Sequence, residues 1–456
     1  MSAEREFEGV LIRRGDRDYD RARADAVWNG RKPRRTPDAI VRAASAGDVA
    51  RALSYARSHG LRVSVRSGGH NWSGSPLRDG GLLIDLSGLG GCEVDPVSAT
   101  ATVGPAATGR DLVAALAPHE LAFPVGHCPT VAVGGFLLSG GLGWNSRAWG
   151  VSCADVQEIE AVTADGRTVI CSETENSDLF WAARGAGPGF FAVVTRFRLG
   201  LHPQPAAIVT TSLTFPLDEV GRVAAWGERT ARELPSYVET SLVLRACADP
   251  AATPPAGPQV MIAATSFAAS PDEALASLAP VADCPFATAA GSRQAPEPTS
   301  FAALHAGADS LWPPCRRYAA DTLWSAESYE TQLTRVADAV THAPSPRSLV
   351  LAPVQPVSEE PVLLRNMSFS PLGRSYCVSY AIWDDPGADE ANALWLRGVA
   401  AATDPPGHGG RYVAEADLEA GADHARRSYA PADWDRLQEL KARWDPENVF
   451  HSYLAP

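Results

Sequence analysis

Glycine is concentrated in short clusters within the first half of the chain, and these clusters constrain the fold more than any other feature. They are Gly68-Gly69, Gly134 to Gly143, and Gly185 to Gly189. Because glycine weakens helices and strands, such clusters in an ordered chain serve positive φ angles or close approach of the backbone to a ligand. Backbone N–H groups in such loops form concave anion sites that suit a pyrophosphate. None has the GxGxxG spacing of a Rossmann site after a strand, so the clusters predict a dinucleotide site in another fold.

The amino-acid composition disfavours several functional classes of protein. The 456 residues include 40 Lys+Arg and 53 Asp+Glu, a net charge of −13, and 45% are apolar. These are globular values, and the acidic balance argues against nucleic acid as a partner. The lysines are Lys32 and Lys441, and neither follows phosphate-loop glycines or lies among apolar neighbours. P-loop enzymes and Schiff-base enzymes are therefore disfavoured.

The spacing of the cysteines and the hydropathy of the chain indicate its cellular compartment and whether it binds a metal. The 8 cysteines never approach CxxC spacing, so we expect neither a dithiol redox centre nor a zinc knuckle, and no metal. The first residues lack the apolar core of a signal peptide, and no stretch approaches a membrane-spanning length. We expect a soluble, cytoplasmic protein with reduced thiols and no membrane partner. The sequence does not indicate an oligomeric state.

Hydrophobic periodicity predicts alternating strands and helices in the first half. A strand at 39–44, a helix at 46–59 capped by Ser45, and a strand at 61–65 make one β-α-β unit that ends at Arg66-Ser-Gly-Gly-His70. Further expected elements are strands at 82–86 and 101–103, a helix at 109–116, a hairpin at 159–171 with an Asp-Gly turn, and a strand at 191–199.

From about residue 205 the pattern changes. Strands are expected at 208–215, 240–245, 259–267 and 376–383, and helices at 217–233 and 272–278. This order predicts an antiparallel sheet covered by helices. An amphipathic helix follows at 431–444, ended by Asp445-Pro446.

His70 and Cys128 are the informative nucleophiles, because each lies beside a glycine cluster. Cys128 occurs in Gly126-His-Cys-Pro-Thr-Val-Ala-Val-Gly-Gly135. Taken alone, His70 could be a turn histidine and Cys128 an inert buried thiol.

The chain resembles the berberine-bridge-enzyme-like flavoproteins of the vanillyl-alcohol-oxidase superfamily. The resemblance is carried by residues 66–74, by 126–143 with its Gly-x-Cys-Pro-Thr-Val, by Asp178-Leu-Phe-Trp-Ala-Ala-Arg-Gly185 through Thr195, and by 437–450. It implies an α+β fold, namely a PCMH-type FAD-binding domain in two parts with an inserted substrate domain. The expected bounds are 1–205 and 406–456 for the FAD-binding parts and 206–405 for the substrate domain, with the active site between them.

The resemblance implies that FAD is bonded to His70 and to Cys128, at the 8α-methyl and C6 of the ring. An imidazole and a thiolate are suitable nucleophiles toward an electron-poor ring. It also implies that Val131 controls the access of oxygen to the cofactor. The alternative is that the Val131 side chain only packs in the core. The further residues expected at the cofactor are Arg66, Ser67, Gly68, Gly69, Asn71, Gly74, Ser75, Thr130, Gly134, Gly135, Gly140, Gly141, Gly143, Asp155 and Phe450.

Hydride transfer from an alcohol or amine requires a base for the proton, and the substrate strands and the C-terminal return can supply one. Tyr376 and Tyr380 share one strand face, and Glu415 stands at a position that often faces the active site in the family, with Tyr412 nearby. The alternatives are that the tyrosines are core residues, which is the commoner role of such side chains, and that Glu415 is a surface ion-pair partner. In the family's Tyr-x-Asn motif the Asn is replaced here by Ala414, so catalytic roles cannot simply be copied.

These features predict a flavin oxidase acting on a small organic substrate, such as a sugar, an alcohol, an amine or a natural product, with O₂ reoxidation to H₂O₂. The frequent Ala, Arg, Gly and Pro residues are typical of a GC-rich bacterial genome, and from this we expect a role in secondary metabolism. The alternatives are a dehydrogenase with another acceptor, a flavoprotein that binds a small molecule without turnover, and a reductase that binds FAD noncovalently. The sequence does not identify the substrate.

Overall fold

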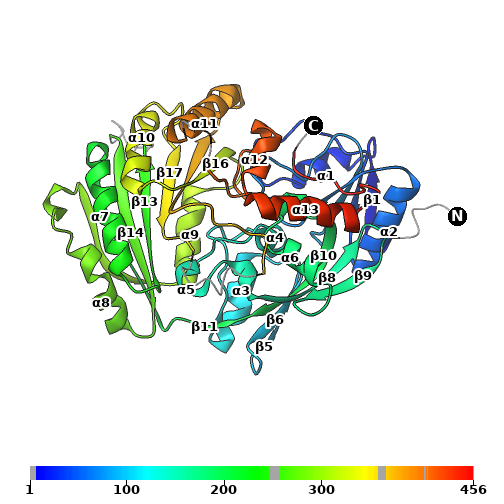
Figure 1. Cartoon of the computed structure of the whole chain (residues 1–456), viewed down its shortest axis with the longest axis horizontal. Helices are drawn as coiled ribbons and strands as arrows, with labels where there is room; N and C mark the ends of the chain where they lie inside the picture. Colours follow the sequence, from blue (N-terminus) through cyan, green and yellow to red (C-terminus); the bar gives the residue numbers. More distant parts are fainter. Residues whose placement is uncertain (1–6, 247–256, 358–365, 405–406, 408, 455–456) are drawn as a thin grey trace.

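The computed structural model describes residues 7–246, 257–357, 366–404, 407 and 409–454. Two domains face each other (Figure 1). We call residues 7–203 with 409–454 the glycine-rich domain, and residues 207–404 the seven-stranded domain. The expected boundary at 205 and 206 falls in the link between β11 (His202–Pro203) and β12 (Ala207–Pro216). The second expected boundary, at 405 and 406, lies outside the described residues.

The first sheet of the glycine-rich domain holds the β-α-β unit that the sequence indicated. Ser45 caps α2 by accepting the N–H of Asp48 at 3.2 Å. The strand β4 lies between β2 and β3 and is parallel to both, so the two strands of the unit do not pair directly. The elements are β1 (Val10–Arg13), α1 (Tyr19–Asp25), β2 (Ala39–Arg42), α2 (Ala46–Ser58), β3 (Val63–Arg66) and β4 (Leu82–Asp85).

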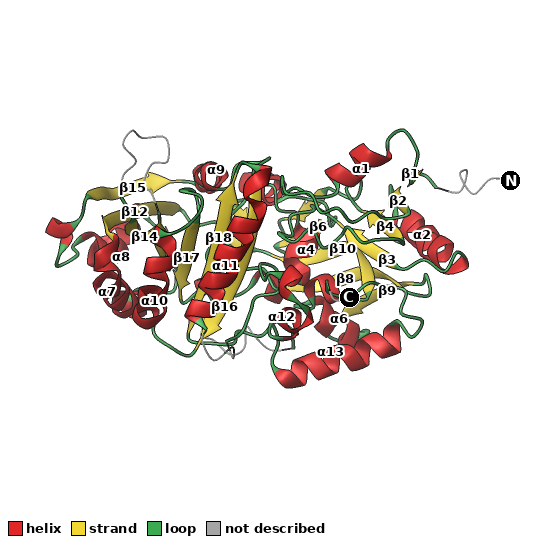
Figure 2. Cartoon of the chain, turned by 90° about the horizontal axis from the view of Figure 1, so that it is seen from above, coloured by secondary structure: helices red, strands yellow, loops and turns green. Residues whose placement is uncertain are grey.

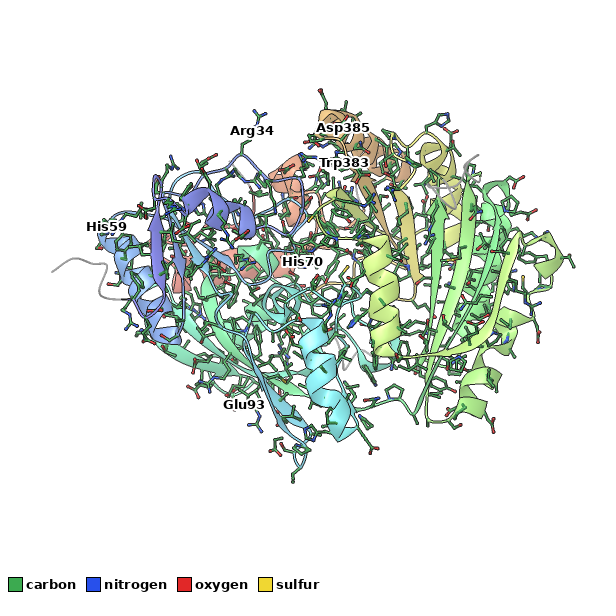
Figure 3. All side chains as sticks on the ribbon, turned by 180° about the vertical axis from the view of Figure 1, so that it is seen from behind. Arg34, His59, His70, Glu93, Trp383 and Asp385 are labelled. Atoms are coloured by element: carbon green, nitrogen blue, oxygen red, sulfur yellow. The ribbon has the colours of Figure 1, made fainter. Side chains whose placement is uncertain are left out.

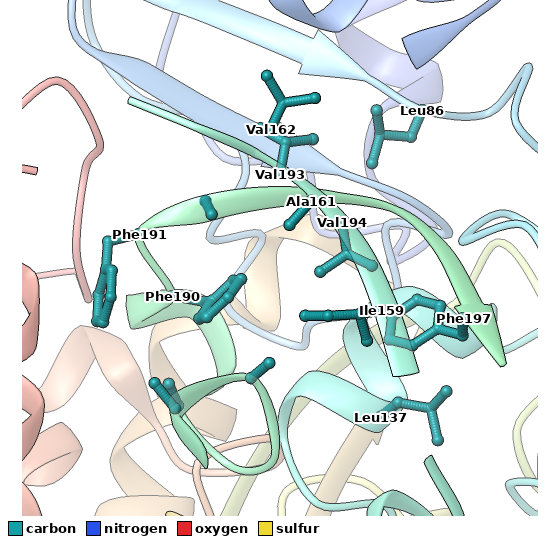
Figure 4. Close-up of a cluster of buried hydrophobic side chains, with 14 of the residues drawn as sticks. Leu86, Leu137, Ile159, Ala161, Val162, Phe190, Phe191, Val193, Val194 and Phe197 are labelled. Carbon is teal, nitrogen blue, oxygen red and sulfur yellow. The ribbon is translucent and has the colours of Figure 1, made fainter. Parts of the chain in front are cut away.

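A second, antiparallel sheet has the order β5-β6-β10-β8-β9. Its core packs Ile159, Val194 and Phe197 together with Leu137, as Figure 4 shows. The strands are β5 (Cys92–Asp95), β6 (Thr100–Val103), β8 (Val156–Thr163), β9 (Thr168–Ser172) and β10 (Ala192–Gly200), and the accompanying elements are α3 (Gly109–Leu116), β7 (Leu121–Ala122), α4 (Val133–Leu138), α5 (Ser146–Trp149) and α6 (Ser177–Ala183).

The C-terminal return completes this domain. Helices α12 (Ala422–Arg426) and α13 (Pro431–Trp444) lie beside the N-terminal elements, red next to blue and green in Figure 1. Leu437 and Leu440 of α13 join the core. Beyond α13, the N–H of Val63 donates to the carbonyl of Val449 at 2.7 Å, and that of His451 donates back to Val63 at 2.8 Å. The strand that leads to His70 is therefore paired with residues almost 390 positions later.

The other domain is one antiparallel sheet of seven strands in the order β15-β12-β14-β13-β17-β18-β16. The expected antiparallel sheet is therefore present. Its strands besides β12 are β13 (Val238–Arg245), β14 (Gln259–Ala268), β15 (Ser292–Thr299), β16 (Arg317–Ser325), β17 (Leu349–Val354) and β18 (Ser375–Trp383).

Helices cover one face of this sheet (Figure 2). They are α7 (Val220–Glu233), α8 (Pro271–Ala282), α10 (Tyr329–Thr341) and α11 (Asp389–Thr403). The remaining helix, α9 (Phe301–Leu311), lies toward α3, to which it is joined by the ion pair Arg110–Asp309 at 3.2 Å. The other face of the sheet is thereby directed at the glycine-rich domain. None of the helices in the described part of the chain is both long enough and apolar enough to cross a membrane.

Candidate active site

A cavity of about 520 Å³ lies between the two domains. The glycine-rich loops and the C-terminal return line one part of it, and the sheet strands and α9 line the other. His70 lies near the middle of the molecule, where the domains face each other, whereas His59 and Glu93 lie at the periphery (Figure 3). A volume of this size falls in the range of small-molecule and cofactor sites.

His70 enters the cavity from the loop after β3. Gly69 precedes it with a φ of +73°, and a Cβ there would lie 2.4 Å from the carbonyl oxygen of Ala26, so only glycine fits. The His70 ring stacks on Trp28 with centroids 4.6 Å apart, and its Nε2 hydrogen-bonds to the Thr130 hydroxyl at 3.0 Å. Burial and the charge of Arg66 lower the pKa of His70 to about 3. The imidazole is therefore neutral and oriented.

Cys128 lines the same cavity from the loop before α4. Burial, reinforced by the negative charges of Glu415 and Asp309, raises the pKa of the Cys128 thiol to about 12. At neutral pH this cysteine is a thiol, which differs from the thiolate expected from the sequence. Any reaction at its sulfur must therefore be coupled to loss of the proton.

The glycines supply the close approaches that their clustering predicted. A Cβ on Gly134 would lie 2.9 Å from the carbonyl oxygen of Pro105, and one on Gly143 would lie 2.3 Å from that of Pro124. Gly135 differs, because its nearest neighbour would be the Ser67 hydroxyl oxygen at 3.9 Å, and its N–H donates to that oxygen at 3.2 Å. Gly134 and Gly143 therefore allow packing of the loops, while the Gly135 backbone stays open toward the cavity.

Buried donors at this part of the cavity fit an anionic dinucleotide. Arg66 and Arg78 line it, and Arg78 is held by the carbonyls of Ser75 and Tyr453. In the described part of the chain, Nε of Arg66 and Nε2 of His451 are buried without a hydrogen-bond partner. Buried polar groups are normally paired, so these two atoms indicate a missing ligand group. Together with the neutral His70 and the open glycine backbone, the donor set fits FAD.

At the sheet side of the cavity, two tyrosines converge on one carboxylate. Tyr376 and Tyr380 lie on the same face of β18 and donate to Glu415 at 3.0 and 2.5 Å. Burial raises the pKa of Glu415, and hydrogen bonds from Tyr380, Tyr376 and Trp72 act in the opposite direction. Burial and the nearby Glu415 charge hold the pKa of both phenols well above their usual value. The phenols thus remain donors, and Glu415 remains the acceptor.

Aromatic side chains surround this carboxylate cluster. Tyr380 meets the rings of Trp72 and Trp312 edge-on, each at a centroid distance of 5.4 Å. Tyr376 packs on Trp324 at 4.5 Å. The cluster is therefore shielded from bulk water, which strengthens its hydrogen bonds and favours proton transfer by a carboxylate with a raised pKa.

Tyr412 also lines the cavity, and its hydroxyl accepts the N–H groups of Gly141 and Leu142 at 3.0 and 3.4 Å. Its own N–H donates to the Thr322 hydroxyl at 2.8 Å. Tyr412 therefore connects the glycine-rich loop to β16, and this contact fixes the segment that carries Glu415.

Most residues expected from the sequence meet in this one cavity. The four catalytic candidates line it, as do His70, Cys128, Arg66, Ser67, Gly68, Gly69, Asn71, Ser75, Val131, Gly134, Gly135, Gly143 and Phe450. The expected residues that do not line it are Gly74, Thr130, Gly140, Gly141 and Asp155. Thr130 acts through His70 instead. Gly140, with a φ of +109°, packs against the Phe369 ring.

Asp155 was expected near the cofactor, but its carboxylate contacts His202 at 2.8 Å outside the cavity lining. The reason is local, because Asp155 ends a short 3₁₀ turn that leads directly into β8. The structure therefore places Asp155 outside the cavity lining, and its contact with the cofactor stays a prediction.

Sequence reasoning missed Glu239 and His127. Glu239 lies on the cavity side of β13, and burial raises its pKa to about 8. The His127 ring meets Trp144 edge-on at 4.2 Å, and burial lowers its pKa to about 4. His127 adjoins Cys128 in the chain and could have been found by that adjacency. Glu239 could not, because its strand carries no motif.

Comparison with known proteins supports the same assignment. A family model described as FAD binding domain matches residues 37–172, and one described as Berberine and berberine like matches residues 411–455. An FAD-linked oxidoreductase from Penicillium ochrochloron, ptmO, is 30% identical over 441 residues, covering 96% of this chain and 94% of that protein.

Solved structures share the fold. The crystal structure of 6-hydroxy-D-nicotine oxidase from Arthrobacter nicotinovorans superimposes with a TM-score of 0.84 at 24% identity, covering 98% of this chain and 97% of that one. Glucooligosaccharide oxidase from Acremonium strictum, described with a 6-S-cysteinyl, 8α-N1-histidyl FAD, gives 0.81 at 20% identity, with 98% and 97% coverage. The cavity's fit to FAD and the match over nearly the whole length lead to one conclusion: this chain belongs to the berberine-bridge-enzyme-like, PCMH-type FAD-linked oxidoreductases, enzymes that oxidise small organic substrates.

Proposed function

We propose that this protein is an oxidase whose FAD is joined covalently to both His70 and Cys128, and that O₂ is the electron acceptor and H₂O₂ the product. The observation that carries the proposal is the shared cavity, which His70, Cys128 and the Glu415 cluster all line. His70 and Cys128 are nucleophiles that could hold a redox cofactor covalently, and Glu415 is a shielded base in the same cavity that could act on the substrate.

The chemistry of the two side chains supports the tethers. The Thr130 hydroxyl engages Nε2 of His70, and a backbone hydrogen bond of Thr130 also acts on the ring. A neutral ring whose Nε2 is engaged by Thr130 can offer Nδ1 as the nucleophile. Each linkage replaces one hydrogen on the side chain and one on the cofactor, and the two electrons and two protons reduce O₂ to H₂O₂. The glucooligosaccharide oxidase, which shares the fold, is described with the same pair of bonds.

When bound, FAD supplies a two-electron acceptor for the hydride that leaves the substrate. The protein's task is to take the accompanying proton and to orient the reacting group. Glu415 accepts that proton from the substrate N–H or O–H, and its raised pKa suits it to do so near neutrality. Tyr376 and Tyr380 hold both carboxylate oxygens in place. The aromatic walls exclude water from the proton-transfer step.

Val131 supports oxygen as the acceptor. It lines the cavity three residues after Cys128, and its side chain is small. The position therefore leaves room for O₂ beside the cofactor.

The test is a peroxide-coupled screen of purified holoenzyme against amines, alcohols, sugars and polyketides. The proposal expects anaerobic bleaching of the flavin by a substrate, followed by O₂ consumption and H₂O₂ release when air is admitted. Bleaching with an artificial acceptor but no O₂ uptake would identify a dehydrogenase. A flavin that stays oxidised with every compound would identify a binding protein.

A further inference from the structure

A second carboxyl group lines the cavity, and nothing above gives it a role. Glu239 lies on β13, where Glu239 and Ser241 both face the cavity. Thr265, directly opposite Glu239 on β14, lines the cavity as well. A carboxylate oxygen of Glu239 accepts the N–H of Ser146 at 3.1 Å. The carboxyl group is therefore fixed in position at the cavity wall of the substrate sheet.

The residues around Glu239 do not offset the negative charge that its ionised carboxylate would carry. The cation that acts on it is Arg147, and this guanidinium donates to the backbone carbonyls of Leu234, Pro235 and Val238. Among the described residues, none forms an ion pair with Glu239. Burial raises its pKa to about 8, so without a bound cation the carboxyl group is largely protonated at neutral pH. A buried carboxyl group avoids the cost of an unpaired charge by staying neutral, and it can ionise when a cation binds next to it.

Charge is segregated within the cavity. The lining arginines, Arg66 and Arg78, lie at the part that fits the dinucleotide. From residue 239 to residue 415, the described lining residues include no lysine and no arginine, but they include Glu239 and Glu415. Trp72, Trp144 and Trp312 add aromatic walls. Carboxyl and aromatic groups that line one cavity can together select a cation with an apolar body.

We propose that Glu239 binds the ammonium group of the substrate, and hence that the substrate is a hydrophobic amine. The assignment rests on the proposed function, because it names the substrate of that site, and it leaves Glu415 as the acceptor of the proton at the reacting centre. When the ammonium ion binds, Glu239 ionises and releases one proton to solvent. Arg147 is the charged group that acts directly on Glu239, and His127 and Glu415 are further titratable groups that line the same cavity.

The test compares three probes of similar size on the holoenzyme: 2-phenylethylamine, 2-phenylethanol and 3-phenylpropionate. Dissociation constants come from quenching of tryptophan fluorescence and from perturbation of the flavin spectrum under anaerobic conditions. We expect the amine to bind at least about tenfold more tightly than the alcohol near pH 8, since charge-assisted hydrogen bonds are the stronger kind. The amine preference should decline toward about pH 6, as the carboxyl group becomes harder to ionise. We expect the propionate to bind most weakly.

Two variants test whether the preference for the amine over the alcohol depends on the carboxyl group of Glu239. Glu239→Gln should remove the preference for the amine, and Glu415→Gln should retain it. Equal binding of amine and alcohol by the unmodified protein would overturn the proposal. A preference that survives in Glu239→Gln, or that disappears in Glu415→Gln, would overturn it too.

Proton release provides a measurement that needs no variant. Calorimetry of the unmodified holoenzyme in two buffers of different ionisation enthalpy should show about one proton released per amine bound near pH 7, and none for the alcohol. Absence of release overturns the proposal even if Glu239→Gln does not fold. These are binding measurements without turnover, so a flavin that no compound reduces would defeat the proposed oxidase and leave the cation site standing.

Discussion

The hydroxyl of Tyr376 donates to a carboxylate oxygen of Glu415 at 3.0 Å, and this bond joins the substrate sheet to the C-terminal return. The two residues are separated by 39 positions and belong to different domains. Because the bond crosses the cavity wall, the geometry of the proposed base depends on how the domains meet.

Glu415→Gln should keep the bound flavin but lower the rate of anaerobic flavin reduction by about 10²- to 10⁴-fold, because a positioned base contributes a factor of that order. Stopped-flow absorbance in a single turnover measures the effect. Glu419→Gln is the matched control, since Glu419 pairs with Arg31 and Arg35 outside the cavity. An unchanged reduction rate in Glu415→Gln would remove it as the base.

Tyr380→Phe should shift the acidic limb of kcat/KM to higher pH. The Tyr380 hydrogen bond lowers the pKa of Glu415, so its loss raises that pKa, and the carboxylate becomes available only at higher pH. Tyr376→Phe should shift the limb in the same direction. Tyr237→Phe, which changes a phenol outside the cavity lining, should leave the profile in place. A shift to lower pH after either change would contradict the arrangement described.

His70→Ala and Cys128→Ser should each retain flavin after acid precipitation, through the remaining bond, and the double variant should release it. Absorbance of the supernatant and of the pellet measures this. Cys92→Ser is the control, because Cys92 is a half-buried thiol outside the cavity lining. Release of flavin from either single variant would mean that only one bond forms.

The two bonds should form with different pH dependence. With the thiol pKa of Cys128 at about 12, the thiolate fraction, and with it the linkage rate in a His70→Ala apoprotein mixed with FAD, should rise about tenfold per pH unit near neutrality. With the imidazole pKa of His70 at about 3, linkage in Cys128→Ser should hardly change over the same range. A flat profile for Cys128 would show that a neighbouring group removes the thiol proton.

Gly185→Ala should lower the free energy of unfolding by about 3 kcal/mol, which is typical of a strained backbone combined with a steric clash. Gly185 has a φ of +142°, and a Cβ there would lie 2.1 Å from the backbone nitrogen of Phe369. Gly398→Ala, on the exposed face of α11 with open space around it, should instead stabilise by about 0.5–1 kcal/mol. Urea unfolding of both variants gives the comparison.

Local signals in the sequence predicted much of this structure. The cap at Ser45, the Asp-Gly turn and the periodicity of residues 431–444 depend on near neighbours, and the corresponding helices and hairpin are present. The α+β class and the FAD-linked family were also predicted correctly, from motifs. The convergence of Tyr376 and Tyr380 on Glu415 was not predicted, because it depends on the register between β18 and the return segment.

Glu239 and Asp155 both show that local sequence does not determine which residues line the cavity. Asp155 had a motif but is turned toward His202 by the start of β8. Glu239 had no motif, and its place at the cavity follows from the order β14-β13-β17 within the sheet. Strand order is set by contacts between distant segments, which no local window of sequence contains.

The pairing of Val63 with Val449 and His451 also bears on biosynthesis. While the ribosome is still translating the middle of the message, the strand that carries His70 lacks its neighbour, and the pocket lacks Phe450 and the wall that holds Glu415. We therefore expect flavin loading to follow translation of residue 451, and we expect a polypeptide truncated before that point to lack the flavin colour.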